Sequence, residues 1–188
     1  MATPKVRSIA KRAGTKRSRS GARVKARKRP RTVVAKQPQP APLDSSVQPF
    51  IVGIGASAGG LQALTAFFEA MPSDSGMVFV VVSHQQPSRT SLLPALLSRS
   101  TQMPVEPVHD GVVLEPDHVY VSVPGKNVAV LGDTLQLMAF ESGPAVHLPI
   151  DYFFRSLARD RNERAICIVL SGTGTDGTLG LRAIKGNS

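Results

Sequence analysis

Three residues with the side chains of an acyl-transfer catalyst each follow a strongly apolar run of the sequence. The residues and the runs before them are Ser57 after 50–54, His84 after 77–82, and Asp176 after 165–170. A serine hydroxyl attacks a carbonyl when an imidazole removes its proton and a carboxylate orients the imidazole. We therefore predict a serine hydrolase in which Ser57 is the nucleophile, His84 the general base and Asp176 the orienting acid.

The loop around Ser57 has the small residues that a sharp strand-to-helix turn requires. Gly55 and Gly59 flank the serine in a Gly-x-Ser-x-Gly pattern and would lift its hydroxyl above the sheet. A helix that begins near Gly59 would direct free N–H groups and the positive end of its dipole to the same place. Such a helix start favours a developing oxyanion.

The same loop admits a second interpretation as a nucleotide-binding turn. Gly53-x-Gly55-x-x-Ala58 satisfies a permissive dinucleotide fingerprint. That fingerprint needs an acidic residue at the end of the second strand, and the chain has Ser83-His84 there. Nucleotide binding is therefore the weaker alternative.

Each of the three predicted catalytic residues also has a purely structural alternative. Ser57 would cap the helix at 59–71, His84 would be a hydrogen-bonded histidine at a strand end, and Asp176 would cap a helix starting near Gly177. The remaining histidines are expected to be structural or exposed: His109, His118 and His147. No spacing of metal-binding side chains indicates a metal site, and we expect no cofactor.

The elements that must position these residues form an alternating pattern of strands and helices. Apolar runs predict buried strands, and apolar residues at helical spacing predict helices. The expected elements are strands at 50–54, 77–82 and 165–170, and helices at 59–71, 88–98, 149–159 and from about 177. Residues 103–140 are expected to form an antiparallel meander with strands at 119–123, 128–131 and 135–139. This pattern predicts an α/β fold: a doubly wound, mostly parallel sheet with helices on both faces and an antiparallel β-hairpin insert.

Charge divides the chain into two parts. Of the 23 lysines and arginines, 14 lie in residues 1–36, which contain none of the 13 acidic residues. We expect residues 1–46 to be a disordered basic and proline-rich tail, and residues 47–188 to be the folded domain. Such a tail fits weak contact with nucleic acid or anionic surfaces, or an organelle transit peptide. No apolar run reaches the roughly 20 residues of a membrane-spanning helix.

The only cysteine, Cys167, excludes an internal disulfide and a cysteine-cluster metal site in this sequence. It lies in the middle of the predicted strand at 165–170, between two isoleucines. We therefore expect a buried, unreactive thiol.

Residues 50–185 resemble the catalytic domain of the chemotaxis protein-glutamate methylesterase family (CheB-like). The stretches that carry the resemblance are 51–60, the strand leading to His84, and 170–177. A fourth, 149–158, resembles the branch in which this domain is joined to a receptor methyltransferase. The family's nucleophile, base and acid match Ser57, His84 and Asp176.

The resemblance implies an activity, partners and a location. The substrate would be a glutamate methyl ester on the helical cytoplasmic part of a bacterial chemoreceptor, and the products methanol and glutamate. Some family members also deamidate receptor glutamines. The implied partners are methylated chemoreceptor helices and a receptor methyltransferase, and the implied location is the cytoplasm.

The sequence departs from the family pattern at three places. Thr173 stands where receiver-linked members have methionine, the basic tail takes the place of a receiver domain, and the pattern of a further strand after the last helix is not met. A domain that is C-terminally short in this way is expected to have an open sheet edge. Two alternative functions follow: a truncated or inactive domain that only binds a receptor or partner, or a nucleic-acid contact made by the tail.

Overall fold

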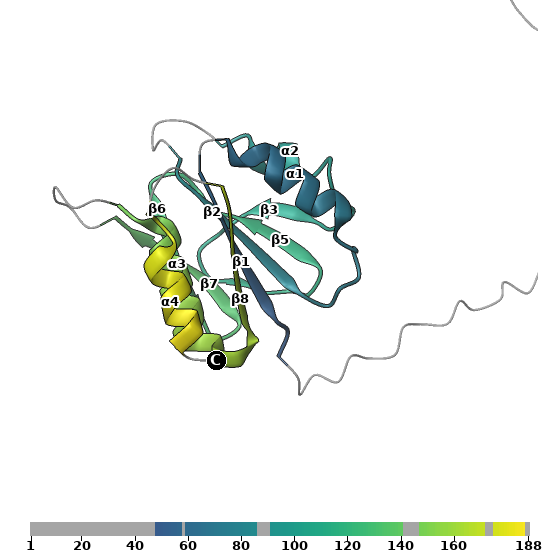
Figure 1. Ribbon diagram of the computed structural model, residues 1–188. Helices are drawn as coiled ribbons and strands as arrows, with labels where there is room; N and C mark the ends of the chain where they lie inside the picture. Colours follow the sequence, from purple (N-terminus) through teal and green to yellow (C-terminus); the bar gives the residue numbers. More distant parts are fainter. Residues whose placement is uncertain (1–47, 58, 86–90, 141–146, 172–174, 187–188) are drawn as a thin grey trace, which may run out of the picture. The chain divides into compact units, whose positions relative to one another are not determined.

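A parallel sheet of five strands forms the centre of the fold. The computed structural model describes residues 48–57, 59–85, 91–140, 147–171 and 175–186, and Figure 1 shows the sheet they form. Its order is β3–β5–β2–β1–β8, and every neighbouring pair is parallel. The strands are β1 (Ile51–Ala56), β2 (Val78–Ser83), β3 (Val105–Pro107), β5 (His118–Val121) and β8 (Ala165–Ser171). The predicted mostly parallel sheet is confirmed.

Within the part of the chain that the structure describes, four helices cover the two faces of this sheet. The first pair, α1 (Gly60–Ala70) and α2 (Leu93–Leu97), lies on one face, and the second, α3 (Pro149–Arg161) and α4 (Thr178–Gly186), lies on the other (Figure 1). A short 3₁₀ helix, η1 (Asn162–Arg164), joins α3 to β8. The predicted helix at 88–98 is shorter in the structure, and residues 88–90 of that prediction lie outside the described residues.

Alternate side chains of the central strands supply both cores. On β2, Phe79 and Val81 face α1 and α2, whereas Val78, Val80 and Val82 face α3. All five are fully buried. Because helices cover both faces of the sheet, both sets of alternating side chains on β2 are buried. This explains why the run is continuously apolar in the sequence.

A second, smaller sheet extends the layer on the α3 side. It contains β4 (Val112–Val113), β6 (Lys126–Leu131) and β7 (Thr134–Ala139) in the antiparallel order β4–β7–β6. The predicted β-hairpin insert is therefore confirmed. The predicted meander over 103–140 is wrong for β3 and β5, which pair in parallel within the main sheet. An apolar β-rich run predicts a strand but not its direction, because both directions present the same side chains.

β8 lies at an edge of the main sheet rather than in its interior. Among the described residues it pairs only with β1, and its Ile166 and Val169 are 37% and 40% exposed. The expectation of a buried third strand is corrected accordingly. Cys167 is half-buried on the inner side of this strand, and burial raises the pKa of its thiol to about 12.

All described residues belong to one compact unit, Pro42–Ser188. The expectation of a disordered tail over residues 1–46 lies outside the described residues. Within the described ranges, no helix is both long and apolar enough to cross a membrane.

Candidate active site at the strand ends

The register of the sheet brings the ends of three strands to one rim. Ala56 at the end of β1 pairs with Ser83 of β2 on one side and with Ser171 of β8 on the other. The helices that follow β1 and β8 lie on opposite faces of the sheet (Figure 1). Helices that diverge in this way leave a crevice beyond the strand ends, where α/β proteins bind their ligands.

Two of the predicted residues are in direct contact at this rim. The His84 Nε2 atom lies 2.7 Å from the Asp176 Oδ2 atom. The two residues follow β2 and β8, which are separated by β1, so their contact spans the end of the strand that leads to Ser57. The histidine side chain is 45% exposed and the carboxylate only 7%. The ring is therefore held at its Nε2 side by a buried acid and faces solvent elsewhere.

The carboxylate of Asp176 is also bound by the beginning of α3. The backbone N–H of Ile150 donates to Oδ2 (3.1 Å), and that of Asp151 donates to Oδ1 (2.8 Å). First-turn N–H groups have no partner within their own helix, and the helix dipole favours a negative charge at this end. Asp176 therefore caps α3, whereas the structural alternative from the sequence had it capping the helix that follows it.

A second carboxylate, that of Asp151 on α3, binds the beginning of α4 in the same way. Asp151 is 3% exposed, and its Oδ1 atom accepts a hydrogen bond of 2.7 Å from the backbone N–H of Gly180 in the first turn of α4. We call the two contacts, Asp176 with α3 and Asp151 with α4, the α3–α4 clasp. Asp151 is not among the site residues predicted from the sequence. The available signal was an acidic residue two positions after Pro149, a pattern typical of a helix start.

The clasp closes because α3 and α4 approach each other unusually closely. A Cβ atom added at Gly180 would lie 2.4 Å from the Phe154 Cβ atom. A Cβ atom at Gly55 would lie 2.6 Å from Ile150 Cγ2, so Gly55 allows α3 to pack on β1. The Gly-x-Ser-x-Gly pattern predicts Gly55 in the turn before Ser57, whereas the structure places it within β1.

The turn that follows Ser57 depends on Gly59. This residue precedes α1 with a φ of 93°, a left-handed conformation that glycine adopts without strain. The backbone N–H of Gly60 closes the turn by donating to the Ser57 carbonyl (2.8 Å). Ser57 is half-buried at the end of β1, and no described hydrogen bond joins it to His84. The catalytic roles of Ser57, His84 and Asp176 remain predictions. Ala58 and Thr173 lie outside the described residues.

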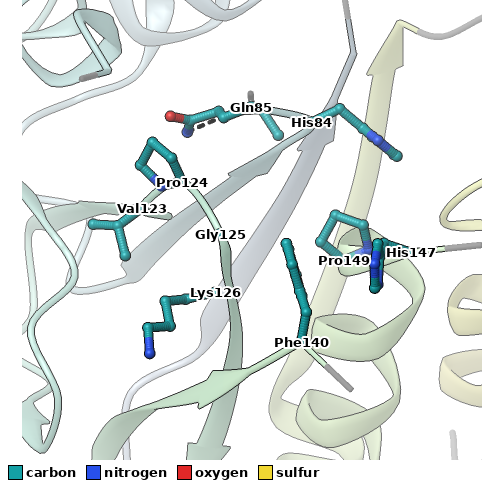
Figure 2. Close-up of a pocket in the computed structure, with 10 residues that line it drawn as sticks. His84, Gln85, Val123, Pro124, Gly125, Lys126, Phe140, His147 and Pro149 are labelled. Atoms are coloured by element: carbon teal, nitrogen blue, oxygen red, sulfur yellow. Dashed lines mark hydrogen bonds between the residues drawn. The ribbon is translucent and has the colours of Figure 1, made fainter. Parts of the chain in front are cut away.

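A side-chain network fixes the backbone on both sides of His84. The Gln85 side-chain N–H group donates to the Ser122 carbonyl (2.8 Å) and to the Ser83 hydroxyl (3.1 Å). The Ser83 backbone N–H donates in turn to the Ser122 hydroxyl (3.2 Å). His84 and Gln85 leave the strand end in opposite directions (Figure 2). This network is not predictable from local sequence patterns, because Ser122 is distant from His84 along the chain.

A cavity of about 200 Å³ opens beside His84. Phe140 and His147 form one wall as a stacked pair, with ring centroids 4.5 Å apart, and residues 123–126 lie across from them (Figure 2). Within the described part of the chain, no three side chains of His, Cys, Asp or Glu are grouped to hold a metal ion. The site consists of the carboxylate–imidazole pair, the strand end that carries Ser57, and this cavity.

Comparisons with known proteins agree with this architecture. The family model of the CheB methylesterase domain matches residues 52–188. The crystal structure of the Thermotoga maritima CheB methylesterase catalytic domain superimposes with a TM-score of 0.65 at 26% identity, covering 75% of this chain and 77% of that one.

Curated relatives carry the same family name. A protein-glutamate methylesterase/protein-glutamine glutaminase 2 of Burkholderia lata is 36% identical over 164 residues, which cover 82% of this chain and 45% of that protein. A protein of the same name from Xanthomonas oryzae pv. oryzae is 34% identical over 152 residues, covering 76% and 42%. The chain thus spans less than half the length of these relatives. From the match of the domain model over residues 52–188, together with the shared fold, the chain belongs to the CheB methylesterase family.

Proposed function

We propose that the chain hydrolyses glutamate methyl esters on chemoreceptors, with Ser57, His84 and Asp176 as its catalytic triad. The observation that carries this proposal is the 2.7 Å contact between His84 Nε2 and Asp176 Oδ2 across the end of β1. The carboxylate of Asp176 also caps α3, but that cap does not require an exposed imidazole beside it. A buried carboxylate paired with an imidazole is the arrangement that a serine nucleophile needs.

The proposed reaction begins at the other ring nitrogen. Because Nε2 faces Asp176, the Nδ1 atom is left to accept the proton of the Ser57 hydroxyl as its oxygen attacks the ester carbonyl. Asp176 stabilises the imidazolium that forms. The tetrahedral intermediate expels the methoxy group, which takes the proton from His84 and leaves as methanol. Water, deprotonated by the same imidazole, then cleaves the glutamyl–serine ester and regenerates the glutamate carboxylate and Ser57.

The negative oxygen of the tetrahedral intermediates would be stabilised by the beginning of α1. The Gly60 N–H is bound to the Ser57 carbonyl, and the next backbone N–H groups of this 11-residue helix lie directly after the turn at Ser57. Preorganised N–H donors of this kind typically contribute about 3–4 kcal/mol each to lowering the barrier. The cavity beside His84 would take the methylated side chain.

The same machinery extends to a receptor glutamine, for which ammonia replaces methanol as the leaving group. The partners proposed are methylated chemoreceptor helices in the cytoplasm and a receptor methyltransferase. The basic residues 1–36 are proposed to add weak contact with anionic surfaces or nucleic acid.

The nucleophile is tested by Ser57→Ala, with methanol release from a methylated chemoreceptor fragment as the readout. We expect turnover to fall by at least about a thousandfold, because the hydroxyl that forms the covalent intermediate is lost. Ser73→Ala, at an exposed serine between α1 and β2, is the matched control and should retain activity. Unchanged turnover in Ser57→Ala would sink the assignment of the nucleophile.

One observation favours a second candidate, a domain that binds receptors without catalysis: the Ser57 hydroxyl has no described hydrogen bond to His84. Nucleophile–base contacts are often long in ligand-free structures, so a competent triad is compatible with the same observation. A fluorophosphonate probe separates them. A competent triad becomes covalently labelled at Ser57, and a binding module does not.

A further inference from the structure

A second cavity continues the active-site cavity along α3. It has a volume of about 550 Å³ and lies between α3 and the β6–β7 hairpin. His147 lines both cavities, whereas Lys126 lines the cavity beside His84 and its neighbour Asn127 lines the second cavity. We call the two together the α3 groove. It leads from His84 along the exposed side of α3.

The lining of the groove is positive, although the folded part of the chain is mildly acidic. Lys126, Arg155 and Arg159 are all exposed, and no hydrogen bond or ion pair of their side chains is found within the described residues. Among the lining residues that the structure describes, the acidic one is Asp151, which is buried and bound to the backbone of Gly180. Residues 37–188 contain 9 basic and 13 acidic residues, so this accumulation of cations is local to the groove.

The cations are spaced for a partner that lies along the helix. Tyr152, Arg155 and Arg159 recur at the i, i+3, i+7 positions of α3, so they form one stripe about 10 Å long, or roughly two helical turns. Tyr152 is 39% exposed, and Met138 on β7 across the groove is 48% exposed. Exposed apolar side chains between cations that have no partner among the described residues match an amphipathic acidic helix, which presents carboxylates beside apolar residues.

We propose that the α3 groove binds an acidic helix of the chemoreceptor and thereby delivers a methylated side chain to His84. This inference rests on the proposed function for its choice of partner, and on charge complementarity for the surface. The cations would act mainly at the rim of the interface, where charge steers association and fixes orientation. Ser156 holds the two sides of the groove together. Its hydroxyl accepts a hydrogen bond from the Val130 backbone N–H (3.1 Å), which links α3 to β6.

The test measures binding rather than turnover. The probe is a soluble chemoreceptor cytoplasmic fragment in its unmethylated glutamate form, and the dissociation constant is measured by fluorescence anisotropy on the full chain. The groove variant is Arg155→Glu/Arg159→Glu. The control is Arg99→Glu/Arg182→Glu, which changes the net charge equally at two exposed arginines outside the groove. The basic tail is identical in both variants, so its contribution cancels.

We expect the groove variant to bind about tenfold more weakly and the control within about twofold of the native chain. Thermal unfolding verifies that both variants are folded. Equal affinities of the groove variant and the native chain, equal weakening in both variants, or failure of the native chain to bind the fragment would each overturn the proposal. Because no turnover is needed, failure of the proposed hydrolysis and failure of the groove are distinguishable.

Discussion

The close contact between α3 and α4 gives a sharp test of how the site is held together. Gly180→Ala adds a Cβ atom 2.4 Å from the Cβ atom of Phe154. That neighbour moves only with the α3 backbone, so a rotamer change cannot relieve the clash. The two helices must separate, which stretches the hydrogen bond from Gly180 to Asp151 and displaces the segment that carries Asp176.

Two opposing terms determine the size of the effect. Alanine is favoured over glycine in a helix by about 1 kcal/mol. Overpacking of a buried contact typically costs about 1–3 kcal/mol, and a backbone-limited clash lies at the upper end of that range. We therefore expect a net loss of about 1–2 kcal/mol in the free energy of unfolding and a melting temperature lower by about 3–6 °C.

The assay is thermal unfolding combined with ester hydrolysis. Gly186→Ala, in the last position of the same helix, is the matched control, because a Cβ atom there has no neighbour within 4 Å. This control should leave stability unchanged or slightly raised. A Gly180→Ala protein that melts at or above the native temperature would refute the reasoning, because the helices would then not be held apart by the missing side chain.

Three further outcomes are expected. Asp176→Ala should lower the rate of ester hydrolysis by about 10⁴-fold and the free energy of unfolding by about 1 kcal/mol, because His84 and the N-terminus of α3 share this carboxylate. Turnover measures the first effect and urea unfolding the second. Arg161→Met should lower the free energy of unfolding, measured in urea, by about 2 kcal/mol, because the buried guanidinium donates to the Gly132 carbonyl (2.7 Å) and to Asp133 (2.9 Å). Arg99→Met is the control and should leave this free energy unchanged. Cys167 should react with iodoacetamide at pH 8 about a thousandfold more slowly in the folded than in the unfolded protein, because burial raises the pKa of its thiol from 9.0 to about 12. The alkylated fraction is measured by mass spectrometry. Equal reaction rates in the folded and unfolded protein would contradict this expectation.

The sequence was sufficient to predict which strand ends approach each other. Apolar runs that lead into Ser57 and His84 are local patterns, and parallel strands always bring their carboxyl ends to one rim. The contact between His84 and Asp176 follows from that rule once β8 lies beside β1. Side-chain chemistry placed at strand ends is therefore among the more predictable features of this fold class.

The parts that were missed depend on interactions between distant segments. The parallel direction of β5 depends on its pairing with β2, which no local pattern encodes. The role of Asp151 depends on how closely α4 approaches, and that distance is set by Gly180, 29 residues away. Among the described residues β8 has the open sheet edge that the departures from the family pattern led us to expect, whereas its apolar run alone has the same appearance as that of an interior strand.

Within the described residues β8 pairs on one side only, and this open edge has a consequence for how the chain behaves in solution. The seven residues of β8 contain neither a charged residue nor a proline, and these are the residues that usually prevent an edge strand from pairing with another extended chain. Association of two molecules through this strand would extend the sheet and cover Ile166 and Val169. Apparent stability would then increase with protein concentration, since self-assembly draws the folding equilibrium toward the native state by mass action.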